Sequence, residues 1–183
     1  MFRYTMWSDT TQEDKDLFNE NGYAITYGEL TLDGLKDIMK KVDDKKDKVF
    51  VDLGSGNGNI VINAIKEYPQ LYMSIGVELS KSRHDVAMDN YMKENVNIRE
   101  KVKFLNQDIL DDGFDYSDFD IIYISNLCFP DDVNIKLSKK IKKECNPSTH
   151  IFCSKQLHDI DKIESFPVCQ TWTNNSIINY YKI

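Results

Sequence analysis

Asp52, Gly54, Gly56 and Gly58 are the residues of this chain whose types and spacing most clearly indicate chemistry. They lie in the sequence DLGSGNG, whose first two residues are also the last two of the apolar stretch Val49–Leu53. Apolar residues at helical spacing follow the glycines. This order predicts a buried strand, a tight glycine turn and a helix. Glycine is needed where the backbone turns sharply and where a ligand lies against it without an intervening Cβ. We therefore expect a ligand-binding loop here, with a turn used only for packing as the alternative.

A second acid ends the next predicted strand, Leu71–Glu78. Glu78 lies 20 residues after Gly58, and a carboxylate at such a strand tip accepts hydrogen bonds from ribose hydroxyls. The G-x-G-x-G spacing differs from the G-x-G-x-x-G of dinucleotide sites and resembles the first motif of the S-adenosylmethionine (SAM) methyltransferases. The resemblance implies that Asp52 lies near the amino group of SAM and that Glu78 binds its ribose. The alternative for Glu78 is a solvated side chain.

Two later strand ends carry further candidates. Asp108 and Ile109 follow the predicted strand Val102–Leu105, and in SAM enzymes of this kind an acid there binds the adenine amino group while an apolar neighbour covers the ring. Asn126 follows the strand Phe119–Ile124, where the methyl acceptor must meet SAM, and a side-chain amide there can orient an amine. A capping aspartate and a plain turn asparagine are the alternatives.

The remaining elements predict how these residues are positioned. Five strands alternate with helices, and a closing hairpin is expected to pair 166–172 with 177–183 through a turn at 173–176. This is an α/β pattern with a mainly parallel sheet, and the antiparallel hairpin is typical of the Rossmann-like seven-stranded methyltransferase fold. Ligands bind beyond the carboxyl ends of such strands. Residues 1–30 are expected to form an N-terminal helix and a lid loop, and residues 31–183 the catalytic domain.

Composition narrows the classes of function. The chain has 183 residues, 41% of them hydrophobic, and a formal net charge of −7, which argues against a generally basic nucleic-acid binder. Its four cysteines form no C-x-x-C pair, so reduced thiols and an intracellular location are expected. We expect no membrane association, because no apolar run approaches the length of a membrane span. No metal site is predicted.

Four stretches resemble one specific family. They are Y-G-E at 27–29, DLGSGNGN with a later G-V-E, S-N-L-C-F at 125–129, and S-K at 154–155 with T-W-T and Y-Y near the end. In this order they resemble the non-SET histone lysine methyltransferases of the disruptor-of-telomeric-silencing class, over about residues 25 to 183. The resemblance implies SAM as cofactor, S-adenosylhomocysteine as product, and a lysine on the folded core of histone H3, in a nucleosome or a histone-like protein, as acceptor.

The resemblance also implies roles for individual residues. Tyr27 and Glu29 would fold over the methionine part of SAM, and Asn126 would lie at the transfer site. Phe129, Trp172 and Tyr180 would form a narrow apolar channel, where loss of water favours the neutral form of lysine. The alternative for these aromatic residues is the core of the hairpin.

A basic segment is the candidate contact to DNA or histone, and it comprises Lys136, Lys139, Lys140, Lys142 and Lys143. Lysines near a helix end also simply complement the helix dipole. A chromatin substrate implies the nucleus, and any other substrate the cytoplasm. The open alternatives are a SAM enzyme acting on RNA, a small amine or a non-histone protein, and a SAM-binding module without catalysis.

Overall fold

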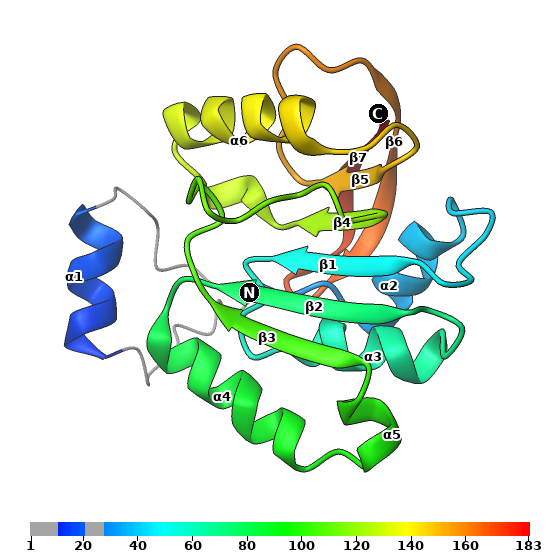
Figure 1. Cartoon of the computed structure of the whole chain (residues 1–183). Coiled ribbons are helices and arrows are strands. Elements are labelled where there is room, and N and C mark those ends of the chain that lie inside the picture. The colour runs from blue at the N-terminus through cyan, green and yellow to red at the C-terminus, as the bar shows by residue number, and fades with distance from the viewer. Residues whose placement is uncertain (1–10, 21–27) are drawn as a thin grey trace.

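The computed structural model describes residues 11–20 and 28–183. In these residues a single sheet runs in the order β3-β2-β1-β4-β5-β7-β6 (Figure 1). The strands are β1 Val49–Leu53, β2 Met73–Glu78, β3 Val102–Asn106, β4 Ile121–Ile124, β5 His150–Cys153, β6 Lys162–Gln170 and β7 Thr173–Lys182. The helices are α1 Gln12–Glu20, α2 Leu32–Met39, α3 Asn59–Glu67, α4 Lys81–Met92, α5 Val96–Arg99 and α6 Asp131–Glu144, with a short 3-10 helix at Asn126–Cys128.

The first five strands are parallel, and their carboxyl ends meet at one edge of the sheet. Leu53 at the end of β1 pairs with Val77 of β2 and Ile124 of β4, and Ile124 pairs in turn with Cys153 of β5. Strand β7 is antiparallel to β5 and β6. The predicted seven-stranded, Rossmann-like methyltransferase fold is confirmed, and its ligand-binding edge is the one that carries the candidate residues.

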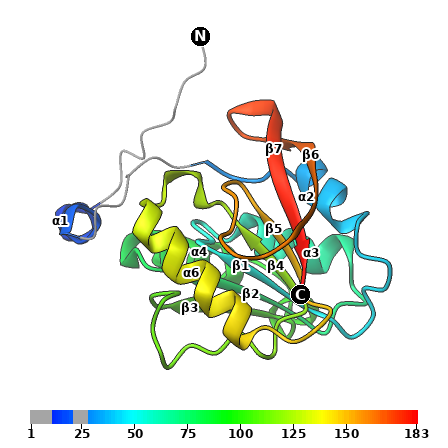
Figure 2. The ribbon, with the colours of Figure 1, turned by 90° about the horizontal axis from the view of Figure 1, so that it is seen from above.

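Apolar side chains fill both faces of this sheet. One face buries α2 and α3 through residues such as Leu35 and Val61, and the other buries α6 through Leu137 and Ile141. Figure 2 shows α6 on the side of the sheet opposite to α2 and α3. The sheet is therefore covered on both faces, as parallel strands with apolar runs require. None of the helices in the described ranges is long and apolar enough to cross a membrane.

The closing hairpin has a different turn from the predicted one. Gln170 pairs with Thr173, so the chain turns at Thr171–Trp172, and residues 173–176 belong to β7. The physical reason is a tertiary contact, because the segment before α2 adds to the hairpin tip. Leu30 forms an isolated antiparallel bridge with Gln170, and the Thr171 N–H donates to the Glu29 carbonyl at 2.9 Å. The two-asparagine signal at 174–175 favoured a turn that these contacts override.

Candidate functional site

The glycine loop has the backbone that the sequence predicts. Gly54, Gly56 and Gly58 have φ values of 92°, 53° and 77°, in the left-handed region that favours glycine. A Cβ on Gly58 would also lie 2.4 Å from the Phe104 ring, so no other residue fits there. The N–H of Gly54 donates to the Val77 carbonyl at 2.8 Å, which ties the loop to β2. The loop thus brings backbone close to the sheet edge at the point where β1 ends.

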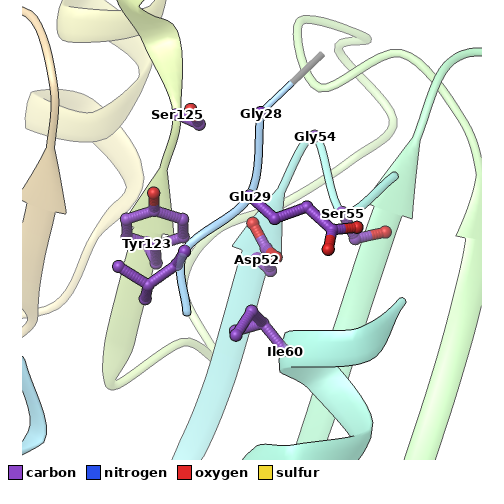
Figure 3. A pocket seen from close by; sticks show the side chains of 9 residues that line it. Gly28, Glu29, Asp52, Gly54, Ser55, Ile60, Tyr123 and Ser125 are labelled. Carbon is purple, nitrogen blue, oxygen red and sulfur yellow. The ribbon is translucent and has the colours of Figure 1, made fainter. Parts of the chain in front are cut away.

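A pocket opens beside this loop and is lined by two acids from distant parts of the chain. Asp52 comes from the end of β1, and Glu29 from the segment that pairs with the hairpin tip. The other lining residues are Gly28, Leu30, Gly54, Ser55, Ile60, Tyr123 and Ser125. Figure 3 shows the Glu29 carboxylate extending over Asp52 toward Ser55. Glu29 and Asp52, which the sequence assigned separately to SAM, therefore line the same pocket, and their predicted contacts with SAM stay predictions.

The surroundings of Asp52 favour binding of a cation. Its side chain is 4% exposed, and its Oδ1 atom has no hydrogen-bond partner among the described residues. Burial and then the neighbouring carboxylates of Glu29 and Glu78 raise the pKa of Asp52 well above its usual range. An ammonium group offsets both effects, since it replaces lost water and neutralises the crowded charge. These residues fit the amino end of SAM, which carries such an ammonium.

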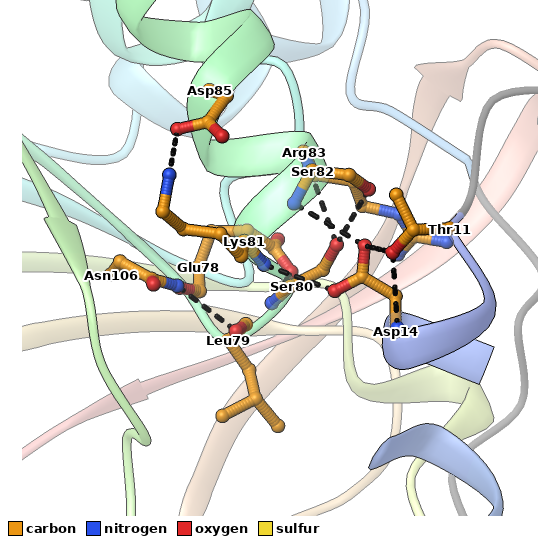
Figure 4. A network of polar contacts seen from close by, with 10 residues as sticks. All are labelled: Thr11, Asp14, Glu78, Leu79, Ser80, Lys81, Ser82, Arg83, Asp85 and Asn106. Atoms are coloured by element: carbon orange, nitrogen blue, oxygen red, sulfur yellow. Dashed lines mark hydrogen bonds and ion pairs between the residues drawn. The ribbon is translucent and has the colours of Figure 1, made fainter. Parts of the chain in front are cut away.

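Glu78 ends β2 and is held by backbone donors. Its two carboxylate oxygens accept the N–H groups of Gly56 and Ser80, each at 2.9 Å. Burial raises its pKa, and the positive charge of Arg83 opposes that shift. Each carboxylate oxygen has two lone pairs, so acceptor capacity remains for a ribose hydroxyl. The geometry therefore fits the predicted ribose contact while fixing the orientation of the carboxylate (Figure 4).

Asp108 and Ile109 follow β3 at the same edge of the sheet, two residues and three residues beyond its end. The Asp108 Oδ1 atom accepts the Leu110 N–H at 2.8 Å, so the side chain caps its own turn. The Ile109 carbonyl accepts the Tyr116 hydroxyl, also at 2.8 Å. Neither residue lines the pocket at Asp52. Their predicted contact with adenine stays a prediction, at a site that the strand order makes adjacent to Glu78.

Asn126 is placed differently from the expectation. Its side chain is fully buried: Oδ1 accepts the Lys155 N–H at 2.8 Å, and Nδ2 donates to Asn134 Oδ1 at 2.6 Å. The amide therefore joins the end of β4 to α6 and to the segment after β5, and both of its polar ends have protein partners. The predicted place of Asn126 at the transfer site stays a prediction, and in this arrangement its amide holds the loop after β4. Ser125, its neighbour, is the residue that lines the pocket.

The three aromatic rings predicted to form a lysine channel do not come together. Tyr180 stacks on Phe152 with ring centroids 4.8 Å apart and lies in the core against α2 and α3. It shares a rung of the sheet with Asp52 but is three strands away, which is about 14 Å at normal strand spacing. Phe129 packs in the opposite core. Tyr180 therefore belongs to the core of the hairpin, which was the alternative to a lysine channel.

Trp172 lies at the hairpin turn and packs against Gly28. A Cβ added to Gly28 would lie 1.9 Å from Trp172 Cζ3, so only glycine allows the indole to lie this close. The Glu29 N–H donates to the Thr171 hydroxyl at 3.1 Å. Trp172 thus packs beside the pocket, on the backbone that presents Glu29. Tyr27, the first residue of the Y-G-E motif, lies outside the described residues.

The basic segment forms the exposed side of α6, with one correction. Lys139, Lys142 and Lys143 are exposed, and Lys136 is exposed beside Asp132. Lys140 is 9% exposed, pairs with Glu144 at 2.9 Å and lies 5.1 Å from the Tyr116 ring centroid. It faces the protein and is not available to DNA or histone, because helical periodicity turns one lysine of the run inward.

Sequence reasoning missed two polar residues that line the pocket, Ser55 and Tyr123, and Gln170, which bonds to Tyr123. Ser55 stands inside the glycine motif, and Tyr123 lies in a strand that reads as apolar on both faces. Gln170 Nε2 donates to the Tyr123 hydroxyl at 2.9 Å across 47 positions of sequence. The available signal was a hydroxyl-bearing residue one position before the end of the predicted central strand.

Comparison with known proteins places the chain in a family. The family model described as "Histone methylation protein DOT1" matches residues 12–180. The histone-lysine N-methyltransferase, H3 lysine-79 specific, of Caenorhabditis elegans is 26% identical over 159 residues, which is 82% of this chain and 16% of that protein. The enzyme of the same description from Dictyostelium discoideum is 26% identical over 122 residues, 62% of this chain and 6% of its own length.

A solved structure supports the fold. The RNA methyltransferase of Salinibacter ruber, in complex with S-adenosyl-L-homocysteine, has a TM-score of 0.66 and 18% identity and covers 81% of this chain and 89% of its own. The present chain spans less than a fifth of the length of the two histone methyltransferases above. From the extent of the family match, together with the acid pocket and the glycine loop, the chain belongs to the histone methylation protein DOT1 family, whose methyl donor is SAM.

Proposed function

We propose that this chain transfers the methyl group of SAM to a lysine side chain on the folded core of histone H3, as part of a nucleosome or of a histone-like protein. The observation that carries the proposal is the buried acid pocket at the end of β1, in a chain of the histone methylation family. When bound, SAM supplies an electrophilic methyl group. The residues of the chain supply binding, orientation and exclusion of water.

Binding is the role of three acids at the sheet edge. Asp52 and Glu29 would hold the ammonium of the amino-acid head, because Asp52 Oδ1 is buried and has no partner within the described ranges. Glu78 would accept the ribose hydroxyls, with its carboxylate fixed by the N–H groups of Gly56 and Ser80. Asp108 and Ile109 would complete the site at adenine. Charge-assisted hydrogen bonds of this kind contribute about 1.5–3 kcal/mol each.

Orientation of the acceptor would come from the loop after β4. Asn126 holds this loop to Lys155, and the Lys155 ammonium donates to the Phe129 carbonyl at 2.6 Å. Trp172 would form an apolar wall beside the lid segment, where it packs on Gly28. An apolar wall disfavours the charged form of an entering lysine and so favours the neutral amine that attacks the methyl group.

The experiment is transfer of labelled methyl from SAM to nucleosomes, free histones and total RNA, followed by mass mapping of the product. Methyl-lysine on histone H3 is the expected result, and a chromatin substrate would place the protein in the nucleus. The Asp52→Asn variant serves as the control for transfer that does not use the pocket. Labelled RNA, with histones unmodified, would overturn the proposed acceptor and leave SAM binding intact.

A further inference from the structure

Tyr123 is the aromatic residue beside the paired acids, and its place in the sheet fixes where its hydroxyl lies. Asp52 and Tyr123 are Cα partners in the parallel pairing of β1 and β4. Partners in register place their side chains on the same face of a sheet. Tyr123 is almost fully buried and lines the pocket together with Asp52 and Ser125. Figure 3 shows its hydroxyl pointing toward Ser125.

Gln170 fixes the direction of the Tyr123 proton. Gln170 is 2% exposed, and its Nε2 donates to the Tyr123 hydroxyl oxygen at 2.9 Å. A tyrosine oxygen that accepts a hydrogen bond still has its own proton to donate. Burial and then the charge of Asp52 raise the pKa of Tyr123, so that proton stays on the oxygen. The pair therefore presents a hydrogen-bond donor on the side of Ser125, whose hydroxyl also bonds to that of Tyr123 and lines the same pocket.

The pocket needs such a donor. The amino-acid head of SAM has a carboxylate as well as an ammonium, and two acids already line this wall. Among the described lining residues none is lysine, arginine or histidine, so hydroxyls and backbone N–H groups are the donors at hand. The Glu29 N–H is already donated to Thr171. A hydroxyl whose orientation is already fixed by a buried amide loses little rotational entropy when it binds a ligand. It is therefore a better donor than a hydroxyl that rotates freely.

We propose that the Tyr123 hydroxyl, oriented by Gln170, binds the carboxylate of the amino-acid head of SAM and so makes the site selective for a methyl donor with an intact head. Tyr123 is then a binding residue, and Gln170 is a positioning residue that acts through it. The inference rests on the proposed SAM site. The two remain separable, because wild-type binding tests the site and the variants test only its selectivity.

The experiment is calorimetric titration of the full chain with SAM and with decarboxylated SAM, which keeps the ammonium and the sulfonium but lacks the carboxylate. Wild type is expected to prefer SAM. Tyr123→Phe should weaken SAM binding about tenfold or more, the effect of losing a hydrogen bond to a charged group, and should leave binding of the decarboxylated form nearly unchanged. Gln170→Met should shift the same ratio in the same direction by a smaller factor.

The double variant and a matched tyrosine complete the test. Gln170→Met should add no further loss of selectivity when Tyr123→Phe is already present, since it acts through that hydroxyl. Tyr181→Phe is the control, because the buried Tyr181 hydroxyl accepts the Leu157 N–H at 3.0 Å in the other core. It should leave the ratio of the two affinities as in wild type. Equal losses for both ligands in Tyr123→Phe, or no loss for SAM, would overturn the inference.

Discussion

Asp52 works against the stability of the free protein and in favour of ligand binding. Its carboxylate is buried beside Glu29 and Glu78, and one of its oxygens has no partner in the part of the chain that the structure describes. Ionising this group in the folded chain is harder than in the unfolded chain, whose value is near 3.8. Such an unfavourable arrangement persists where a function needs it. A cationic ligand supplies the missing partner.

Asp52→Asn should therefore stabilise the free protein near neutral pH while weakening SAM binding about tenfold or more. The pKa of Asp52 is raised on folding, so the folded chain binds more protons than the unfolded chain between the two values. The stability of the wild type should accordingly fall as pH rises from the unfolded value through the raised folded one. The variant should lack this contribution. Thermal unfolding across pH, with calorimetry for SAM, measures both effects.

Asp120→Asn is the matched control at the opposite end of β1. Asp120 accepts the Val49 N–H at 2.8 Å and pairs with Lys48 at 2.9 Å. This change removes favourable contacts, so the variant should be less stable and should bind SAM as wild type does. Unchanged SAM affinity in Asp52→Asn would refute the role of Asp52 in binding.

At this scale the sequence predicts residues whose role follows from a strand end, and fails where a role depends on a distant partner. Asp52 and Glu78 stand at the tips of apolar runs, and parallel strands bring such tips to one edge. Asn126 also stands at a strand tip, but Asn134 and Lys155 occupy its amide, and only the folded chain shows that. The Tyr123–Gln170 pair could not be predicted, because it depends on the register of the hairpin.

At the scale of elements, one buried carboxylate of α1 bonds to the start of α4 at the carboxyl ends of the parallel strands. Asp14 accepts the backbone N–H groups of Lys81 and Ser82 in the first turn of α4, at 3.1 and 3.3 Å, and its own helix cap, Thr11, donates to it at 3.0 Å (Figure 4). Phe18 of α1 lies 5.0 Å from the Arg83 guanidinium. Figure 1 places α1 beyond the end of the sheet where the parallel strands finish.

Asp14→Ala should release α1 from α4. Burial raises the pKa of Asp14, but hydrogen bonds from Ser82, Thr11 and Ser80 outweigh it, so the net shift is downward. Its stabilisation is then complete above the unfolded value of 3.8 and lost as pH falls through the lower folded pKa. Hydrogen exchange of the 12–20 amides should be about tenfold faster in the variant at neutral pH.

Asp16→Ala changes an exposed acid of the same helix, whose side chain accepts a hydrogen bond from Gln12 at 2.8 Å, and should leave exchange nearly unchanged. Acidification below about pH 3.8 should lower the protection of these amides, relative to the exchange of an unfolded chain at the same pH, more in wild type than in Asp14→Ala. Equal exchange in both variants at neutral pH would mean that apolar contacts such as Phe18 hold α1 without the carboxylate.

The hairpin marks the limit of predicting elements from sequence. Its two strands were expected, since apolar and β-branched residues recur there. The turn was predicted four residues long at 173–176, whereas the structure turns at Thr171–Trp172. Local turn propensity of Asn174 and Asn175 is outweighed by pairing of the tip with Leu30 and Glu29. That pairing closes the pocket with Glu29, so the element that local reasoning misplaced is part of the site.

At the scale of the whole molecule, the negative net charge of the chain disfavours binding to the proposed substrate, a nucleosome. The chain has a net charge of −7, and DNA is a dense polyanion. Attraction to a nucleosome must come from a local positive surface, and the exposed lysines of α6 are the candidate: Lys136, Lys139, Lys142 and Lys143. Lys140 is excluded because it is buried against Tyr116. The lysine surface lies on α6, which begins just after the loop that contains Asn126 and Phe129.

Reversal of Lys139, Lys142 and Lys143 to Glu should slow methylation of nucleosomes several-fold and that of free histone H3 much less, because only the first substrate presents DNA to the helix. Binding through phosphates releases counterions, so the wild-type rate on nucleosomes should fall with added salt, and the slope should be shallower in the variant. Lys46, Lys93 and Lys103 are also exposed, and their reversal gives the same net charge away from α6. If the two triple variants slow the nucleosome reaction equally, net charge alone accounts for the effect and α6 makes no specific contact. If only the α6 variant is slow and its salt slope is reduced, this helix meets the nucleosome and sets the face on which the acceptor lysine approaches the pocket.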